Sequence, residues 1–282
     1  MLLLASAHIS YAQNIDYASV QAAFDRASRP SFLQRAVGRL SMPLKQSDKL
    51  TLTGRAGIAY TPETDLALTL TASAAYRGKE QHPYSHLAAS VMASIDGFYR
   101  LQIAGEQLFG MGEGRLLYDV GIGSLPTRFW GLGYDAAINN VRTRYTLFTT
   151  YGTATYLHHI AGGLHVGAGV DMRYGAGREV EPLAEEYLQA GGQGVRSTYT
   201  TGLSLTLRFD TRNSQYNASQ GIYLALTGEV RPKALGNYSQ TLWHLTAQAN
   251  YYQALWQGAV AALDLYADAW SSAAPWFYWP TM

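Results

Sequence analysis

The chain has 282 residues, enough for one large β-domain, and no stretch rich in Pro, Ser or one charge divides it. Charged residues make up 15% and the formal net charge is +1, so the sequence lacks the basic footprint of a nucleic-acid-binding protein. Cysteine is absent, which excludes a disulfide scaffold, and no apolar run of about 18 residues predicts a membrane-spanning helix.

The first 48 residues predict an exported chain with a short helical segment ahead of the main domain. Residues 1–12 have the apolar run and the small residues before a cleavage site that are typical of a signal peptide, cut after Ala12. A frayed hydrophobic N-terminus is the alternative, because basic residues do not open the segment. In residues 13–48, Val20, Phe24 and Ala27 are spaced as on one face of a helix, which predicts a periplasmic helical lead-in.

From residue 49 onward the apolar period changes to two, the period of β-strands. A tight turn is expected at Asp96 and Gly97, and the connections at 123–142 and 175–196 are much longer than the others. About eleven strands fit into residues 49–282, with short turns at one end of the sheet and long loops at the other. The fold class predicted is all-β.

Residues 202–231 show two strands and the turn between them most clearly. The apolar residues of the first strand are Leu203, Leu205, Leu207 and Phe209, and hydroxyl or charged residues stand between them. One face of such a strand suits lipid and the other suits water, as in a transmembrane antiparallel β-barrel. A soluble β-sandwich also alternates, so it remains an alternative at this point. Aromatic residues reach 12% with 21 Tyr, which favours a barrel with aromatic girdles.

Charged residues gather on the polar face of the predicted strands. Buried or lumenal charge must be paired or hydrated, so these residues predict a wet lumen held by ion pairs, with a specific substrate path as the alternative. The residues concerned are Arg55, Arg77, Arg100, Asp171, Arg173, Arg208, Glu229, Asp264 and Asp268.

The sequence predicts no catalytic site, metal site or cofactor, and we do not expect an enzyme. His158 and His159 are adjacent, but neighbours on a strand point to opposite faces and cannot readily share one ion. A Gly-x-Ser-x-Gly nucleophile turn does not occur in the sequence.

Two segments resemble the bacterial surface antigen superfamily, the BamA/TamA-like outer-membrane barrels. One is FDTRN with the turn after it, in which the matching residues are Asp210, Thr211, Arg212, Asn213 and Gly221. The other is FWGLGYDA in an expected external loop, in which the matching residues are Phe129, Trp130, Gly131, Gly133 and Asp135.

The resemblance implies a transmembrane barrel of about sixteen strands, of which about eleven are present. The end of the chain, APWFYWPTM, is similar to the start of the sixth external loop of that family, so residues 49–282 are expected to be an incomplete barrel domain. Residues 1–48 leave no room for the transport-associated repeats that precede the barrel in BamA and TamA.

The resemblance also implies a function in the bacterial outer membrane, in contact with its lipid and lipopolysaccharide. The barrel would help to place client β-barrel proteins in the membrane, alone or with assembly-complex subunits, by opening between its first and last strands. A structural or passive-pore barrel, or the membrane domain of a larger protein, is the alternative. The expected edge strand is marked by Leu50, Leu52, Gly54, Ala56, Ile58 and Tyr60, and its glycines weaken its packing.

Overall fold

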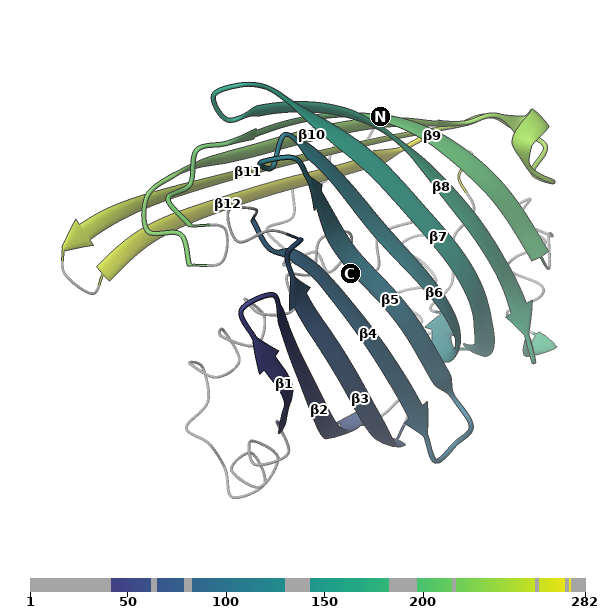
Figure 1. Cartoon of the computed structure of the whole chain (residues 1–282). Helices are drawn as coiled ribbons and strands as arrows, with labels where there is room; N and C mark the ends of the chain where they lie inside the picture. The colour runs from purple at the N-terminus through teal and green to yellow at the C-terminus, as the bar shows by residue number, and fades with distance from the viewer. Residues whose placement is uncertain are drawn as a thin grey trace.

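The computed structural model describes residues 42–61, 65–78, 83–129, 143–182, 197–214, 217–256, 259–271 and 274. Twelve strands form one antiparallel sheet, and every strand pairs with its neighbours in the sequence (Figure 1). They are β1 (Met42–Ser47), β2 (Leu50–Thr61), β3 (Asp65–Tyr76), β4 (Ser85–Ser94), β5 (Tyr99–Phe109), β6 (Gly114–Phe129), β7 (Thr143–Ala161), β8 (Leu164–Arg178), β9 (Ser197–Asp210), β10 (Gly221–Arg231), β11 (Leu242–Trp256) and β12 (Ala259–Trp270), with a short 3-10 helix η1 (Lys233–Leu235) before β11. The all-β prediction is confirmed.

The sheet is strongly curved and open. Figure 1 shows the purple β1 and the yellow β12 at its two edges, and in the part of the chain that the structure describes these two strands do not pair with each other. No helix among the described residues is long and apolar enough to cross a membrane, a finding that does not bear on spans made of strands.

The two faces of the sheet are inverted relative to those of a soluble protein. Large apolar side chains are exposed on one face, where Leu205 keeps 71% of its surface accessible and Leu245 keeps 49%. Charged side chains on the other face are buried, among them Asp171, Arg208 and Arg231. A sandwich packs two sheets face to face, whereas the described strands form a single sheet, so the two-layer alternative does not describe this fold. We call the charged face the inner face and the apolar face the outer face.

The sheet begins earlier than the sequence predicts. Strand β1 lies inside residues 13–48, the expected helical lead-in, and adds a twelfth strand to the expected eleven. It pairs with the first part of β2 through a tight turn, and its register shifts between Pro43 and Lys45. Proline is tolerated in an edge strand or at a bulge, so the proline does not prevent this pairing. The expected signal peptide and the rest of the lead-in lie outside the described residues.

The connections differ between the two ends of the sheet. Short turns join β1 to β2, β5 to β6 and β7 to β8 at one end, here named the turn end, which also carries the β9–β10 connection. Gly110, Gly112 and Gly162 have positive φ in these turns, a conformation that favours glycine. The opposite end, here named the loop end, carries the long connections after β6 and β8 and the tight Asp96–Gly97 turn, in which Gly97 has φ 81°.

Candidate functional site

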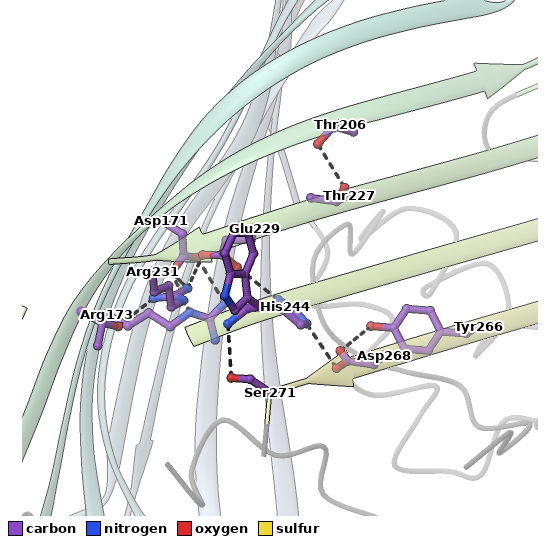
Figure 2. Close-up of polar contacts among 12 residues, drawn as sticks. Asp171, Arg173, Thr206, Thr227, Glu229, Arg231, His244, Tyr266, Asp268 and Ser271 are labelled. Carbon is purple, nitrogen blue, oxygen red and sulfur yellow. Dashed lines mark hydrogen bonds and ion pairs between the residues drawn. The ribbon is translucent and has the colours of Figure 1, made fainter. Parts of the chain in front are cut away.

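A charge network lies on the inner face where β8, β10, β11 and β12 approach the loop end. Its centre is Arg231, whose Nη2 forms ion pairs with Asp171 and, at 2.7 Å, with Oε1 of Glu229. Arg173 donates from Nε and Nη2 to the two oxygens of Asp171 at 2.9 and 3.2 Å. Figure 2 shows these side chains converging from β8 and β10, which lie on either side of β9 in the sheet. The guanidinium of Arg231 thus joins two carboxylates from different strands.

Strand β9 passes between the strands that supply these charges, and its inner side chains make room for them. Arg231 donates from Nη1 to Oγ1 of Thr200 at 2.9 Å, and its side chain is 1% exposed. Two residues further along β9 is Gly202, where an added Cβ would overlap Oε1 of Glu229. A residue without a side chain at this position therefore lets Glu229 and Arg231 lie over the strand.

His244 extends the network to the edge strand β12. Its Nδ1 lies 3.1 Å from Oε2 of Glu229 and its Nε2 lies 3.2 Å from Oδ1 of Asp268. The ring stacks on Trp270 with centroids 3.9 Å apart, and Tyr266 donates to the other oxygen of Asp268 at 3.1 Å. Because ionised carboxylates only accept hydrogen bonds, His244 satisfies both of them when both its ring nitrogens carry a proton. In that state three cations balance the three carboxylates of the network.

A second cluster lies at the turn end, where β9 meets β10. Oδ1 of Asp210 accepts hydrogen bonds from the backbone N and from Nε of Arg212, at 3.1 and 2.9 Å. Oδ2 accepts from Nη2 of Arg212 at 2.8 Å and lies 3.5 Å from Nη2 of Arg208. The ring of Tyr223 lies near both guanidinium groups, 5.2 Å from that of Arg208 and 4.5 Å from that of Arg212. The hydrogen bond that the Arg212 side chain donates to Asp210 raises the pKa of Arg212.

The remaining residues of the FDTRN turn hold its backbone. Thr211 donates its N–H to the carbonyl of Ile222 at 2.9 Å, and its Oγ1 accepts the N–H of Ile222 at 3.1 Å. Oδ1 of Asn213 accepts from the backbone N of Ser219 and of Gln220, at 3.1 and 3.3 Å. Side-chain bonds of this kind to nearby backbone groups stabilise turns.

Gly221 closes the turn with φ 113°, and an added Cβ would lie 2.7 Å from Cα of Arg212. Both the conformation and the close approach of the backbone require glycine there. Each of the five motif residues therefore has a contact or a conformation that shapes the turn.

Comparison with known families decides what kind of domain this is. Residues 124–267, just over half of the chain, match the Omp85 superfamily domain. The chain belongs to the Omp85 superfamily. The resemblance to the bacterial surface antigen superfamily is thereby confirmed, and members of this superfamily are outer-membrane proteins. No curated protein matches the chain in a sequence comparison.

The matched region of the Omp85 domain runs from β6 into β12 and contains the FDTRN turn, Arg231 and His244. Those predicted lumen charges that lie within strands all share one face of the sheet, the inner face, as the strand register shows. Asp171, Arg173, Glu229 and Asp268 join the charge network, and Arg208 joins the turn cluster. The others, Arg55, Arg77, Arg100 and Asp264, do not join either cluster; Arg77, just after β3, donates from Nε to the carbonyl of Asp48 at 2.8 Å.

The predicted edge of the sheet, which precedes the matched residues, needs a correction. Strand β1 covers Leu50, Leu52 and Gly54 of the expected edge strand, because its register runs from Ser47↔Leu50 to Met42↔Gly54. Beyond that point, from Ala56 to the end of β2, no second strand lies on this side among the described residues. The sequence pattern did not predict β1, because β1 is defined as a strand by its pairing with β2 and not by its own short pattern.

The structure describes one residue of the expected external loop motif. In the expected external loop motif, Phe129 ends β6, and Trp130, Gly131, Gly133 and Asp135 lie outside the described residues. Sequence reasoning did not include Arg231, His244 or Gly202 in the site. Arg231 and His244 alternate in step with the polar residues of their strands, and this signal could have identified both.

Proposed function

We propose that the curved sheet is the wall of a β-barrel in a bacterial outer membrane, with its outer face toward lipid and its inner face toward a polar lumen. The observation that carries this proposal is the order of exposed residues along the outer face. Exposed aromatic residues lie toward the turn end and again toward the loop end, with Leu, Ile and Val between them. Toward the turn end they are Phe109, Tyr156, Tyr251 and Trp256; toward the loop end they are Tyr174, Tyr199 and Trp243.

The spacing of these two bands supports a membrane span. On β11, Trp243 lies in the loop-end band and Tyr251 and Trp256 in the turn-end band, about 26 and 43 Å from Trp243 along the strand axis. For a strand tilted by 35–45° these lengths correspond to roughly 20 and 33 Å along the membrane normal. Outer-membrane barrels have an apolar band about 25 Å tall between two aromatic girdles. Tyr174 and Tyr199 are directly paired across β8 and β9, so the loop-end band continues from one strand to the next.

Cell fractionation tests the location. The full-length gene product is expressed with its native leader, and we expect recovery in the outer-membrane fraction with a folded form that migrates faster on a gel unless it is heated. Recovery in the soluble periplasm would contradict the proposal.

We further propose that the chain helps to insert client β-barrel proteins into this membrane. Membership of the Omp85 superfamily supports the proposal, and so does the edge of β2 from Ala56 onward, whose backbone could receive an added strand. The proposed partners are lipid and lipopolysaccharide on the outer face, client β-barrel strands at the edge and subunits of an assembly complex.

Disulfide capture tests the edge. Ile58→Cys places a thiol on the part of β2 that has a described partner strand, β3, on one side only, and Leu224→Cys, on a strand flanked by β9 and β11, is the matched control. An unfolded client barrel with a cysteine in its terminal strand should cross-link to the first variant and not to the second. Equal cross-linking would mean that capture does not depend on the edge.

A passive barrel without assembly or enzymatic activity is the second candidate. The observation in its favour is that Asp171, Glu229, Arg231 and His244 pair with one another, as expected for a structural wall. Solute flux through liposomes containing the protein, without client capture at Ile58→Cys, would support this candidate.

A further inference from the structure

Two histidines face each other across the β7–β8 hairpin at the turn end. His159 and His165 are directly paired in the register, and both lie on the inner face. Their ring centroids are 5.2 Å apart with an angle of 63° between the planes. His165 is 7% exposed, so its ring is held within the structure and not in open solvent. The adjacent His158 is exposed on the outer face.

The hydrogen bonds of both rings determine where their protons lie. Nε2 of His159 is 2.8 Å from the carbonyl oxygen of Gly162, and Nδ1 of His165 is 3.2 Å from the carbonyl oxygen of Gly163. A carbonyl oxygen only accepts, so each of these nitrogens must carry the proton. In the neutral rings, Nδ1 of His159 and Nε2 of His165 are then lone-pair donors, and neither is bonded to a described residue.

We propose that His159 and His165 bind one divalent transition-metal ion, such as Zn²⁺ or Cu²⁺. Two imidazoles on one tetrahedral ion, with metal–nitrogen bonds of about 2.0–2.1 Å, have ring centroids about 5 Å apart, which matches the observed pair. Metal-binding histidines almost always donate their second ring N–H to a carbonyl or carboxylate, and both of these rings do so. Imidazole ligands suit Zn²⁺, Cu²⁺ and Ni²⁺ better than Mg²⁺ or Ca²⁺.

The charges nearest His165 are those of Arg115 and Arg208, whose positive charge would oppose a bound cation if it were not offset. Arg115 forms an ion pair with Glu106 at 3.0 Å, and Arg208 lies 3.5 Å from Asp210, so each nearby arginine has a carboxylate partner. Among the described residues no group of three or more His, Cys, Asp or Glu side chains is placed to hold an ion. The site therefore has two protein ligands, and water would complete the coordination.

A bound ion would stabilise the β7–β8 hairpin, which contacts the FDTRN turn. Gly163 accepts the backbone N–H of Asp210 at 3.0 Å, and a Cβ on Gly163 would overlap the carbonyl of Asp210. The β7–β8 turn thus contacts Asp210 directly, and Asp210 is the carboxylate that pairs with Arg208 and Arg212. Linking β7 to β8 next to this contact would stabilise the turn end of the wall.

Titration of the purified, folded full-length protein with Cu²⁺ tests the site. Electron paramagnetic resonance reports whether nitrogen atoms bind the ion, and thermal unfolding with and without Zn²⁺ reports the stabilisation. The variants are His159→Gln and His165→Gln, and His158→Gln is the matched control on the opposite face. Heat-modifiability without metal checks that each variant is folded; if His165→Gln is not, His159→Gln alone decides, since this ring is more exposed.

We expect one tightly bound Cu²⁺ with two nitrogen ligands and a rise in melting temperature with Zn²⁺. Either substitution in the pair should weaken binding by at least about tenfold, because losing only an outer partner of a metal ligand already costs 10–100-fold. Unchanged affinity in folded His159→Gln, or an equal loss in His158→Gln, would overturn the proposal.

Discussion

Arg231 on β10 and Asp171 on β8 form an ion pair across β9, the strand that lies between them in the sheet. Contact between strands that are not neighbours requires the intervening strand to carry a small residue, and Gly202 is the residue of β9 paired with Asp171. The inner wall of this Omp85 domain is therefore held by side-chain contacts as well as by the backbone ladder.

Gly202→Ala should destabilise the protein, because the new methyl group would overlap the carboxylate of Glu229. Overpacking of this kind costs about 1–3 kcal/mol. Urea unfolding of the protein in lipid vesicles measures the loss. Gly228→Ala is the control, since a Cβ there meets nothing within 4 Å. Equal stability of the two variants would show that the wall tolerates a side chain under Glu229.

Arg231→Met removes the cation shared by Asp171 and Glu229. Breaking a buried ion pair on one side costs about 3–5 kcal/mol, and we expect the lower end because Arg173 and His244 still contact the two carboxylates. The free energy of unfolding gives the comparison. Arg100→Met, which removes an exposed side chain from the same face, should cost less than about 1 kcal/mol. A loss at Arg231 as small as that at Arg100 would mean that the network is hydrated.

Arginine substitutions test which face meets lipid. Leu205→Arg and Leu245→Arg should each cost about 2–4 kcal/mol if they lie near the bilayer midplane, because both side chains are exposed on the outer face. Thr246→Arg lies on the inner face opposite Asp268 and should cost much less. The free energy of unfolding in vesicles should fall more for the outer-face substitutions than for the inner-face one. Equal losses would contradict the assignment of the faces.

Asp210 can be tested with two substitutions in the FDTRN turn. Asp210→Ala removes the acceptor for the backbone and side chain of Arg212, which should cost about 1–3 kcal/mol. Asp210→Asn keeps one oxygen acceptor but loses the charge, so an intermediate loss is expected. Barrel assembly and unfolding are measured on both variants. If Asp210→Asn behaves like the wild type, the hydrogen bonds that Asp210 accepts within the turn account for its whole role, and its charge has none.

The sequence by itself determined the alternation of faces and the turn motif. A period of two needs only local information, so Leu203, Leu205 and Leu207 predict an apolar face without knowledge of any partner strand. The motif residues Asp210 and Asn213 act on backbone groups within a few positions, and short-range contacts of this kind can be read from the chain.

The tertiary structure decided everything that depends on register. The shared guanidinium of Arg231, the space at Gly202 and the opposed rings of His159 and His165 each require residues from strands whose relative alignment is not encoded in any one of them. A shift of one residue in pairing would move each of these side chains to the other face. The partner of β2 was likewise decided by pairing, because the short β1 becomes a strand only beside it.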